Sequence, residues 1–252
     1  MRTLLRLSVL ALLIAVPFSA MAQEDEEKPL GYVYATYFEC DVEREWMADA
    51  VVKNLFAPVY DAAVEDGTLT AWGWLAHHTG GHWRRILYRV TPTLEGALDA
   101  HESIAKKVQA AGEKVAGELG AVCNRHEDYI WQQVTSSNKR ERGAAGFSVY
   151  LDCDSSKEER VDELMTTVIG PIFDKYVGDG KLTSWGFARH IVGGEWRRLS
   201  TMSAADHKTL LKVRGEIIAE LSGDDAPAEA QEYFELCDEH VDYMWDIQLE
   251  KP

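Results

Sequence analysis

The stretch DGTLTAWGWLAHHTGGHWRR at residues 66–85 returns as DGKLTSWGFARHIVGGEWRR at residues 179–198. The two copies are identical at 12 of 20 positions and lie 113 residues apart throughout. A second motif, C-x-x-H-x-D-Y-x-W, begins at Cys123 and again at Cys237. A repeat of roughly 110 residues has the size of a small domain rather than of a solenoid repeat. The chain is therefore an internal duplication, and we expect two small domains packed on each other about a pseudo-twofold axis.

Both copies predict the same order of elements. Each opens with an alternating strand and continues into a helix that contains a proline, Pro58 or Pro171, where we expect a kink or a restart. The Gly-Gly pairs at 80–81 and 193–194 predict a hairpin between the next two strands. A second helix and a last strand after the C-x-x-H motif complete each copy.

The order β-α-β-β-α-β resembles the ferredoxin-like fold, and two such units in one chain resemble the tandem-fused form of the dimeric α+β barrel superfamily. The resemblance implies an α+β protein in which two ferredoxin-like repeats pack as a pseudo-twofold barrel. The predicted organisation is a signal peptide (1–22), a polar arm (23–30), repeat 1 (31–135), a polar linker (136–145) and repeat 2 (146–252).

The first 22 residues are typical of a secretory signal. Arg2 and Arg6 precede the apolar run LSVLALLIAVPF, and Ala20-Met21-Ala22 fits a small-x-small cleavage site. An uncleaved membrane anchor is the alternative, but the run is shorter than the ~18 apolar residues that a span needs. We therefore expect a periplasmic or secreted protein that does not associate with a membrane after cleavage.

The chain is strongly acidic. Its 26 basic and 42 acidic residues give a net charge of −16, and loss of the two arginines of the signal makes the mature protein more acidic still. Such a charge repels nucleic acid and anionic membranes at long range. The expected partner is a small molecule rather than nucleic acid, and self-association into a homo-oligomer is compatible with the composition.

Four cysteines in an exported protein predict disulfides, and three pairings are open. The strand order of the ferredoxin-like fold places strand 4 antiparallel to strand 1, which implies the pairs Cys40–Cys123 and Cys153–Cys237. Each bridge closes a loop of roughly 80 residues and is worth on the order of 4 kcal/mol in the chain-entropy model. The alternative is that Cys-x-x-His forms a metal corner.

Hairpin register divides the side chains around Gly80-Gly81 into two rows. One row pairs His77 with Arg84 and is otherwise apolar, so we expect it to pack on the helices. The other row is rich in tryptophan and arginine, and we expect it to line a cleft between the two repeats. Its members are Trp72, Trp74, Trp83 and Arg85 in the first copy and Trp185, Phe187, Trp196 and Arg198 in the second. Such a cleft suits a planar or anionic ligand, although the same residues also serve in interdomain packing.

The candidate catalytic residues are polar side chains that recur in both copies. They are His77, His190, Arg84, Arg197, Tyr37 and Tyr150. A histidine beside an arginine is also a common structural arrangement. No metal site is expected beyond a weak adventitious one around His77, His78 and His82, because the second copy replaces two of these three histidines.

Three functions remain open at this stage. The first is an exported protein that binds a small organic or anionic ligand in the Trp/Arg cleft. The second, implied by the resemblance, is a small-molecule enzyme: a cofactor-free monooxygenase, an isomerase or a haem-dependent relative. The third is a structural envelope protein. The sequence requires no cofactor, and the motifs for serine hydrolysis, nucleotide binding and covalent haem attachment are missing from it.

Overall fold

The computed structural model describes residues 31–137 and 142–252. The predicted signal peptide and polar arm, and part of the predicted linker, lie outside these residues. The first half contains β1 (Tyr32–Glu39), α1 (Glu45–Val51), η1 (Val52–Phe56), α2 (Ala57–Glu65), β2 (Ala71–Gly80), β3 (Arg85–Thr91), α3 (Leu94–Val122) and β4 (Arg125–Ser136). The second half contains β5 (Ala145–Asp152), α4 (Glu158–Leu164), η2 (Met165–Ile169), α5 (Gly170–Gly178), β6 (Ser184–Val192), β7 (Arg198–Ala204), α6 (His207–Ser222), α7 (Ala228–Leu236) and β8 (Glu239–Lys251).

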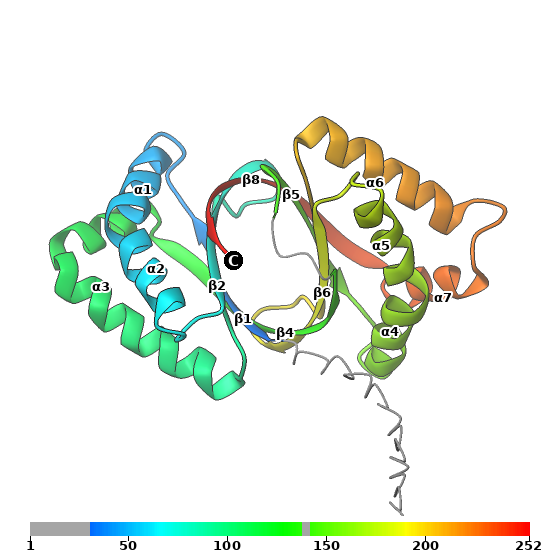
Figure 1. Ribbon diagram of the computed structural model, residues 1–252, viewed down its shortest axis with the longest axis horizontal. Helices are drawn as coiled ribbons and strands as arrows, with labels where there is room; N and C mark the ends of the chain where they lie inside the picture. The colour runs from blue at the N-terminus through cyan, green and yellow to red at the C-terminus, as the bar shows by residue number, and fades with distance from the viewer. Residues whose placement is uncertain (1–30, 138–141) are drawn as a thin grey trace, which may run out of the picture.

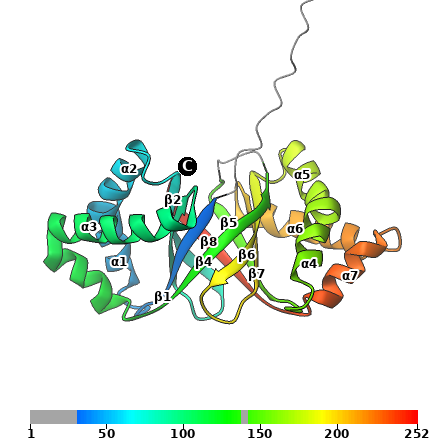
Figure 2. The same cartoon turned by 90° about the horizontal axis from the view of Figure 1, so that it is seen from below.

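The eight strands form one closed antiparallel barrel in the order β1-β3-β2-β8-β5-β7-β6-β4. Each half contributes four neighbouring strands, and the halves meet at two seams, β2–β8 and β4–β6. Every strand therefore has two hydrogen-bonded neighbours within a single chain. Helices α1–α3 cover one side of the barrel and α4–α7 cover the opposite side (Figures 1 and 2). The fold is thus α+β with a closed barrel at its centre.

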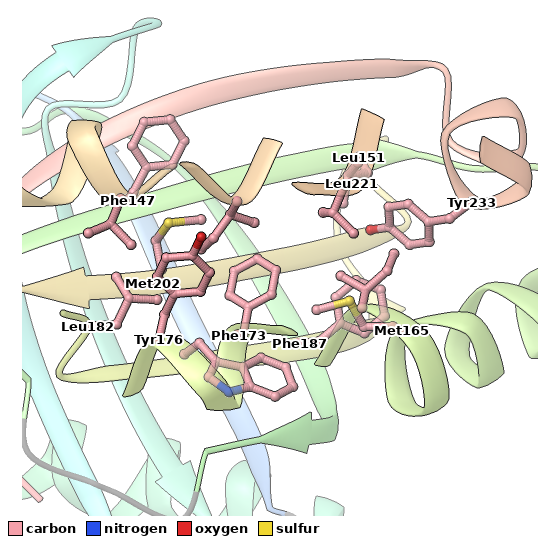
Figure 3. Close-up of a cluster of buried hydrophobic side chains, with 14 of the residues drawn as sticks. Phe147, Leu151, Met165, Phe173, Tyr176, Leu182, Phe187, Met202, Leu221 and Tyr233 are labelled. Carbon is pink, nitrogen blue, oxygen red and sulfur yellow. The ribbon is translucent and has the colours of Figure 1, made fainter. Parts of the chain in front are cut away.

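Three hydrophobic clusters hold this architecture together. One lies between the helices and strands of the first half, and a second lies in the same place in the second half. Figure 3 shows part of the latter, where Phe173 and Met165 of the helical side meet Phe147, Phe187 and Met202 of the strands. The third cluster fills the interior of the barrel with residues from both halves. Alternation along each strand sends one row outward under the helices and the next row into the barrel.

The predicted disulfides are confirmed. Cys40 follows β1 and Cys123 precedes β4, and these antiparallel neighbours place the two sulfurs in a bond. The bridge Cys153–Cys237 occupies the same place between β5 and β8. Each half is closed by its own crosslink, and the metal-corner alternative is wrong because both cysteine pairs are oxidised.

The first helix of each half contains a π-helical turn. The turns cover Val52–Phe56 and Met165–Ile169, and the next α-helix starts directly before Pro58 or Pro171. Proline lacks the N–H that would bond to the preceding turn, so a helix tolerates it best at its beginning. The helix therefore restarts at these prolines, as the sequence predicts. None of the helices in the described residues is both long and apolar enough to cross a membrane.

Candidate functional site

Most of the Trp/Arg row lies under the helices, so the predicted position between the repeats is wrong for every member except Trp83 and Trp196. The indole N–H groups of Trp72 and Trp74 donate to Asp61 and Asp49 of the helices at 2.9 and 2.8 Å, and Arg85 also pairs with Asp49 at 2.7 Å. The second half repeats this arrangement. Trp185 donates to Asp174, Arg198 pairs with Asp162, and Phe187 belongs to the helix-side cluster.

The physical reason is that the helices supply carboxylates to this row. Under the helices, each buried guanidinium and indole N–H of this row has a hydrogen-bond partner on a helix of the same half. These polar groups can therefore be buried between the sheet and the helices without losing their hydrogen bonds. Two members behave differently. Trp83 follows the hairpin turn and lies in the barrel interior, where it stacks on Tyr37 with ring centroids 4.4 Å apart, and Trp196 packs against the same interior cluster.

The barrel interior is filled by aromatic rings from both halves. Tyr37 and Tyr150 meet near the middle with their ring centroids 5.5 Å apart, and Trp131 donates to the hydroxyl of Tyr37 at 3.2 Å. Burial raises the pKa of Tyr37 and of Tyr150 far above the ordinary value, so both phenols stay protonated. These two tyrosines do face the space between the sheets, and they contribute to its packing.

His77 and His190 occupy matching positions in hydrogen-bonded networks. His77 Nδ1 lies 2.6 Å from a guanidinium nitrogen of Arg84, which also pairs with Glu45. An arginine can only donate, so Nδ1 accepts and the imidazole is neutral. Burial and the guanidinium lower the pKa of His77, and His190 shows the same shift beside Arg197. The two networks link the hairpins to the helices.

A different polar cluster lies between the sheet and the helices of the first half, and sequence analysis did not identify it. Its centre is Arg89 of β3, which is 6% exposed. The guanidinium donates to Thr36 Oγ1 at 3.2 Å, lies 3.2 Å from His101 Nδ1 and stacks over the ring of Tyr34 at 4.3 Å. The buried Tyr60 of α2 lies near it. We call these residues, with Asp128, the Arg89 cluster.

Arg89 is the unusual member because its buried charge lacks a carboxylate. No Asp or Glu oxygen among residues 31–137 and 142–252 lies within ion-pair distance of it, and its Nε has no hydrogen-bond partner there. The buried Arg85 and Arg198, in contrast, each pair with two carboxylates. Burying a guanidinium without a counterion costs several kcal/mol. An unpaired buried cation with a free N–H is a ready binding group for an anion.

Titratable groups border this guanidinium. Burial, followed by the charge of Arg89, lowers the pKa of His101, so this imidazole is neutral near pH 7. The pKa of Tyr34 is raised by burial and by the neighbouring carboxylate of Asp128. Asp128 also accepts a hydrogen bond of 2.7 Å from Thr36. The rings of Tyr34 and His101 stack at 4.7 Å and are half-buried, so they separate Arg89 from solvent.

The duplication shows that this cluster belongs to the first half alone. Asp128 has a counterpart in Asp242, but the other members do not recur. The positions equivalent to Arg89, His101, Thr36, Tyr34 and Tyr60 hold Met202, Arg214, Val149, Phe147 and Phe173. Figure 3 shows Phe147, Phe173 and Met202 in an apolar cluster at that place. The second half also holds a guanidinium here, but it belongs to Arg214, which stacks over Phe147 at 4.6 Å and pairs with Asp242 at 2.9 Å. The two halves thus differ in that the guanidinium of the first half is buried without a paired carboxylate among the described residues, whereas that of the second half is paired.

His77, His190 and His101 offer a poor fit for haem. A haem ligand needs a free imidazole nitrogen that faces an unfilled slot. Nδ1 of both His77 and His190 accepts from an arginine, which leaves the proton of each neutral imidazole on Nε2, and the barrel beside them is filled by tryptophan and tyrosine rings. His101 stacks face to face on Tyr34. No step is therefore assigned to haem. A group that could hold a metal ion, His78 with His207 and Asp246, lies at the β2–β8 seam.

Comparison with known proteins identifies the fold. Neither a protein-family model nor a curated protein matches the chain. Solved structures do match. A "putative monooxygenase" from Lactobacillus acidophilus NCFM has a TM-score of 0.60 at 8% identity, covering 88% of this chain and 95% of its own.

Two further structures have similar coverage. An anthrone oxidase-like protein has a TM-score of 0.53 at 10% identity, covering 89% of this chain and 94% of its own. A mutant chlorite dismutase from Candidatus Nitrospira defluvii has a TM-score of 0.51 at 8% identity, covering 86% and 92%. The chain therefore has the fold of the dimeric α+β barrel proteins.

Proposed function

We propose that the protein is a small-molecule enzyme of the oxygenase type, and that its site is the Arg89 cluster rather than the space between the halves. The observation that carries the proposal is the buried guanidinium of Arg89, which, among the residues that the structure describes, has no carboxylate partner and leaves its Nε–H without a hydrogen bond. The similarity in fold to monooxygenase-like and anthrone oxidase-like proteins favours an enzyme over a simple binding protein.

The proposed substrate is a planar aromatic compound with an acidic C–H next to a carbonyl group. When the C–H proton leaves, its electron pair moves onto the carbonyl oxygen, and the resulting oxyanion would pair with Arg89. His101 is the proposed proton acceptor because its lowered pKa keeps it neutral. Substrate would displace Tyr34 and His101 from their stack, which frees His101 Nδ1 from the guanidinium.

The polar residues around the guanidinium position this chemistry. The hydroxyl of Thr36 accepts a hydrogen bond from the guanidinium of Arg89 and donates one to Asp128. These two bonds fix the position of the Thr36 hydroxyl between Arg89 and Asp128. The stabilised carbanion forms a C–O bond to dioxygen, the second substrate and oxidant, and the peroxide takes the proton back from His101. The hydroperoxide then loses its remaining C–H proton and its O–O bond breaks, so that the CH2 group and O2 become a second carbonyl group and H2O.

The test is turnover of anthrone, a planar ketone of this kind, by the mature protein in air. We expect absorbance change and oxygen uptake that fall by about 10²–10³-fold in Arg89→Met, the loss typical of removing an oxyanion partner. The matched control is Arg214→Met, which removes the guanidinium nearest the equivalent layer of the second half. Equal loss in both variants, or full activity in Arg89→Met, would reject the assignment.

We also propose that each half is a ferredoxin-like repeat, with the boundaries predicted above, and that the gene arose by tandem fusion. The strand orders β4-β1-β3-β2 and β8-β5-β7-β6 support this proposal. Export to the periplasm or the medium is proposed on the sequence of residues 1–22, and the two disulfides favour an oxidising compartment.

A further inference from the structure

Two histidines and one aspartate from both halves of the chain meet at the β2–β8 seam. His207 Nε2 lies 2.7 Å from Asp246 Oδ1, and His78 Nδ1 lies 3.3 Å from the same oxygen. The two imidazole rings stack with centroids 3.7 Å apart. Within residues 31–137 and 142–252 this is the group of His, Cys, Asp or Glu side chains whose ligand atoms all lie within 4.8 Å of one another.

The local backbone geometry of β2 brings His78 close to His207 and Asp246. His77 pairs with Trp245 and Thr79 pairs with Met244, so His78 is the extra residue of a β-bulge. A bulge changes the direction in which a strand presents its side chain. Asp246 follows Trp245 on β8, and His207 is the first residue of α6, whose N-cap is Asp206. The site therefore forms only when the two halves have closed into the barrel.

We propose that His78, His207 and Asp246 bind one divalent transition-metal ion of the zinc or copper type. Two imidazole nitrogens and a carboxylate oxygen are a ligand set that these ions prefer. The ion would take the place of the proton that His207 shares with Asp246, and this proton would leave to solvent. His78 and Asp246 are both partly exposed, so the side chains can turn toward a common point and water can complete the coordination.

The second seam, between β4 and β6, supports a specific role for these residues. The positions equivalent to His78, His207 and Asp246 hold Ile191, Leu94 and Gln132, so no ligand recurs at the β4–β6 seam. There, Gln132 accepts hydrogen bonds from Arg189 instead. Two seams with the same backbone thus differ at all three positions, which gives the site an internal negative control.

The other histidines near the hairpin take no part in the cluster. His77 contacts Arg84, and His82 lies 3.8 Å from Glu127. The weak hairpin site predicted from the sequence is therefore replaced by one that uses only His78 from that group. His82, in the turn that follows β2, provides an exposed histidine of the same hairpin for comparison.

The test uses metal-free mature protein without a histidine tag, titrated with ZnCl₂ by calorimetry. Each substitution copies the residue at the equivalent position of the other half: His78→Ile, Asp246→Gln and, as control, His82→Glu. We expect one ion per wild-type chain, a higher melting temperature with zinc, and at least tenfold weaker binding in the first two variants. The control should bind as the wild type does.

A melting curve of each variant, recorded without metal in the presence of a chelator, shows whether that variant folds. His78 is exposed, so His78→Ile should melt like the wild type without metal, and it decides the test if Asp246→Gln fails to fold. Wild-type binding below one equivalent overturns the proposal. Equal affinity in His78→Ile, or loss of binding in His82→Glu, also overturns it.

Discussion

Replacing Arg89 by methionine should stabilise the fold while it removes function. Methionine is the residue at the equivalent position of the second half, Met202, where it packs in an apolar cluster. The substitution loses two hydrogen bonds of Arg89, to Thr36 and His101, each worth about 1.5 kcal/mol because the donor is charged. It also loses the stacking of the guanidinium on Tyr34, worth about 0.5–1 kcal/mol at a half-exposed ring. Neither partner is stranded, because Thr36 still donates to Asp128 and His101 is half-buried.

The opposing contribution is larger. A buried guanidinium without a carboxylate carries a desolvation penalty of several kcal/mol, which methionine removes. We therefore expect Arg89→Met to increase the free energy of unfolding by about 1–3 kcal/mol. For a chain of this size the melting temperature rises by about 2–4 °C for each kcal/mol.

Arg85→Met is the matched control. Arg85 is equally buried but pairs with Asp49 and Glu45, so its removal leaves a carboxylate without its counterion. Because Asp49 keeps some contact with solvent, we expect a loss of about 2–3 kcal/mol, near the lower end for broken buried pairs. Urea unfolding of both variants measures the difference. Arg89→Met destabilised by more than about 1 kcal/mol would refute the reasoning, because it would show that the guanidinium serves the fold.

Further predictions concern pH, the disulfides and the hairpin. The pKa values of His77, His101 and His190 in the folded protein lie below the ordinary 6.5, so the unfolded chain binds more protons than the folded one as the pH falls. The free energy of unfolding should therefore decrease as the pH drops from about 7 through these lowered values. Melting curves at pH 7 and pH 5 test the sign, and a higher melting temperature at pH 5 would contradict it. Cys40→Ser with Cys123→Ser should cost about 4 kcal/mol in denaturant unfolding, since the bridge spans 83 residues, and an unchanged midpoint would oppose that estimate. Gly81→Ala should cost about 1–3 kcal/mol because its new methyl group would lie 2.2 Å from the buried Tyr243 hydroxyl. Gly215→Ala, in the open middle of α6, should instead gain about 0.5–1 kcal/mol by the same assay, and a loss there would point to contacts that the structure lacks.

The architecture was predictable because duplication makes weak local signals agree. Strand alternation, the Gly-Gly hairpins and the paired cysteines each occur twice at the same spacing, and the disulfide pairing followed from the implied strand order. The polarity of the side chains did not predict which face of the hairpin packs against the helices. A row with Trp74 and Arg85 looks suited to a polar cleft until Asp49 of the helix is seen to satisfy both side chains.

The candidate site was missed for a related reason. Sequence analysis favoured residues that recur in both copies, such as His77 and His190, and these form structural networks. Duplicated halves that diverge place a new activity where they differ. Comparison of Arg89 with Met202, and of His101 with Arg214, is available in the sequence and marks the divergent layer. The sequence does not show that Arg89 and His101 lie in one buried cluster, because this depends on how α3 packs on β3.

The most direct measurement is a crystal structure of the mature protein soaked with an aromatic carboxylate, an anion that imitates the proposed oxyanion. We predict ligand density in the first half, with a carboxylate oxygen at hydrogen-bond distance from Arg89 Nε and with Tyr34 and His101 moved apart. Ligand density among the aromatic rings of the barrel interior, with Arg89 still covered, would contradict the account.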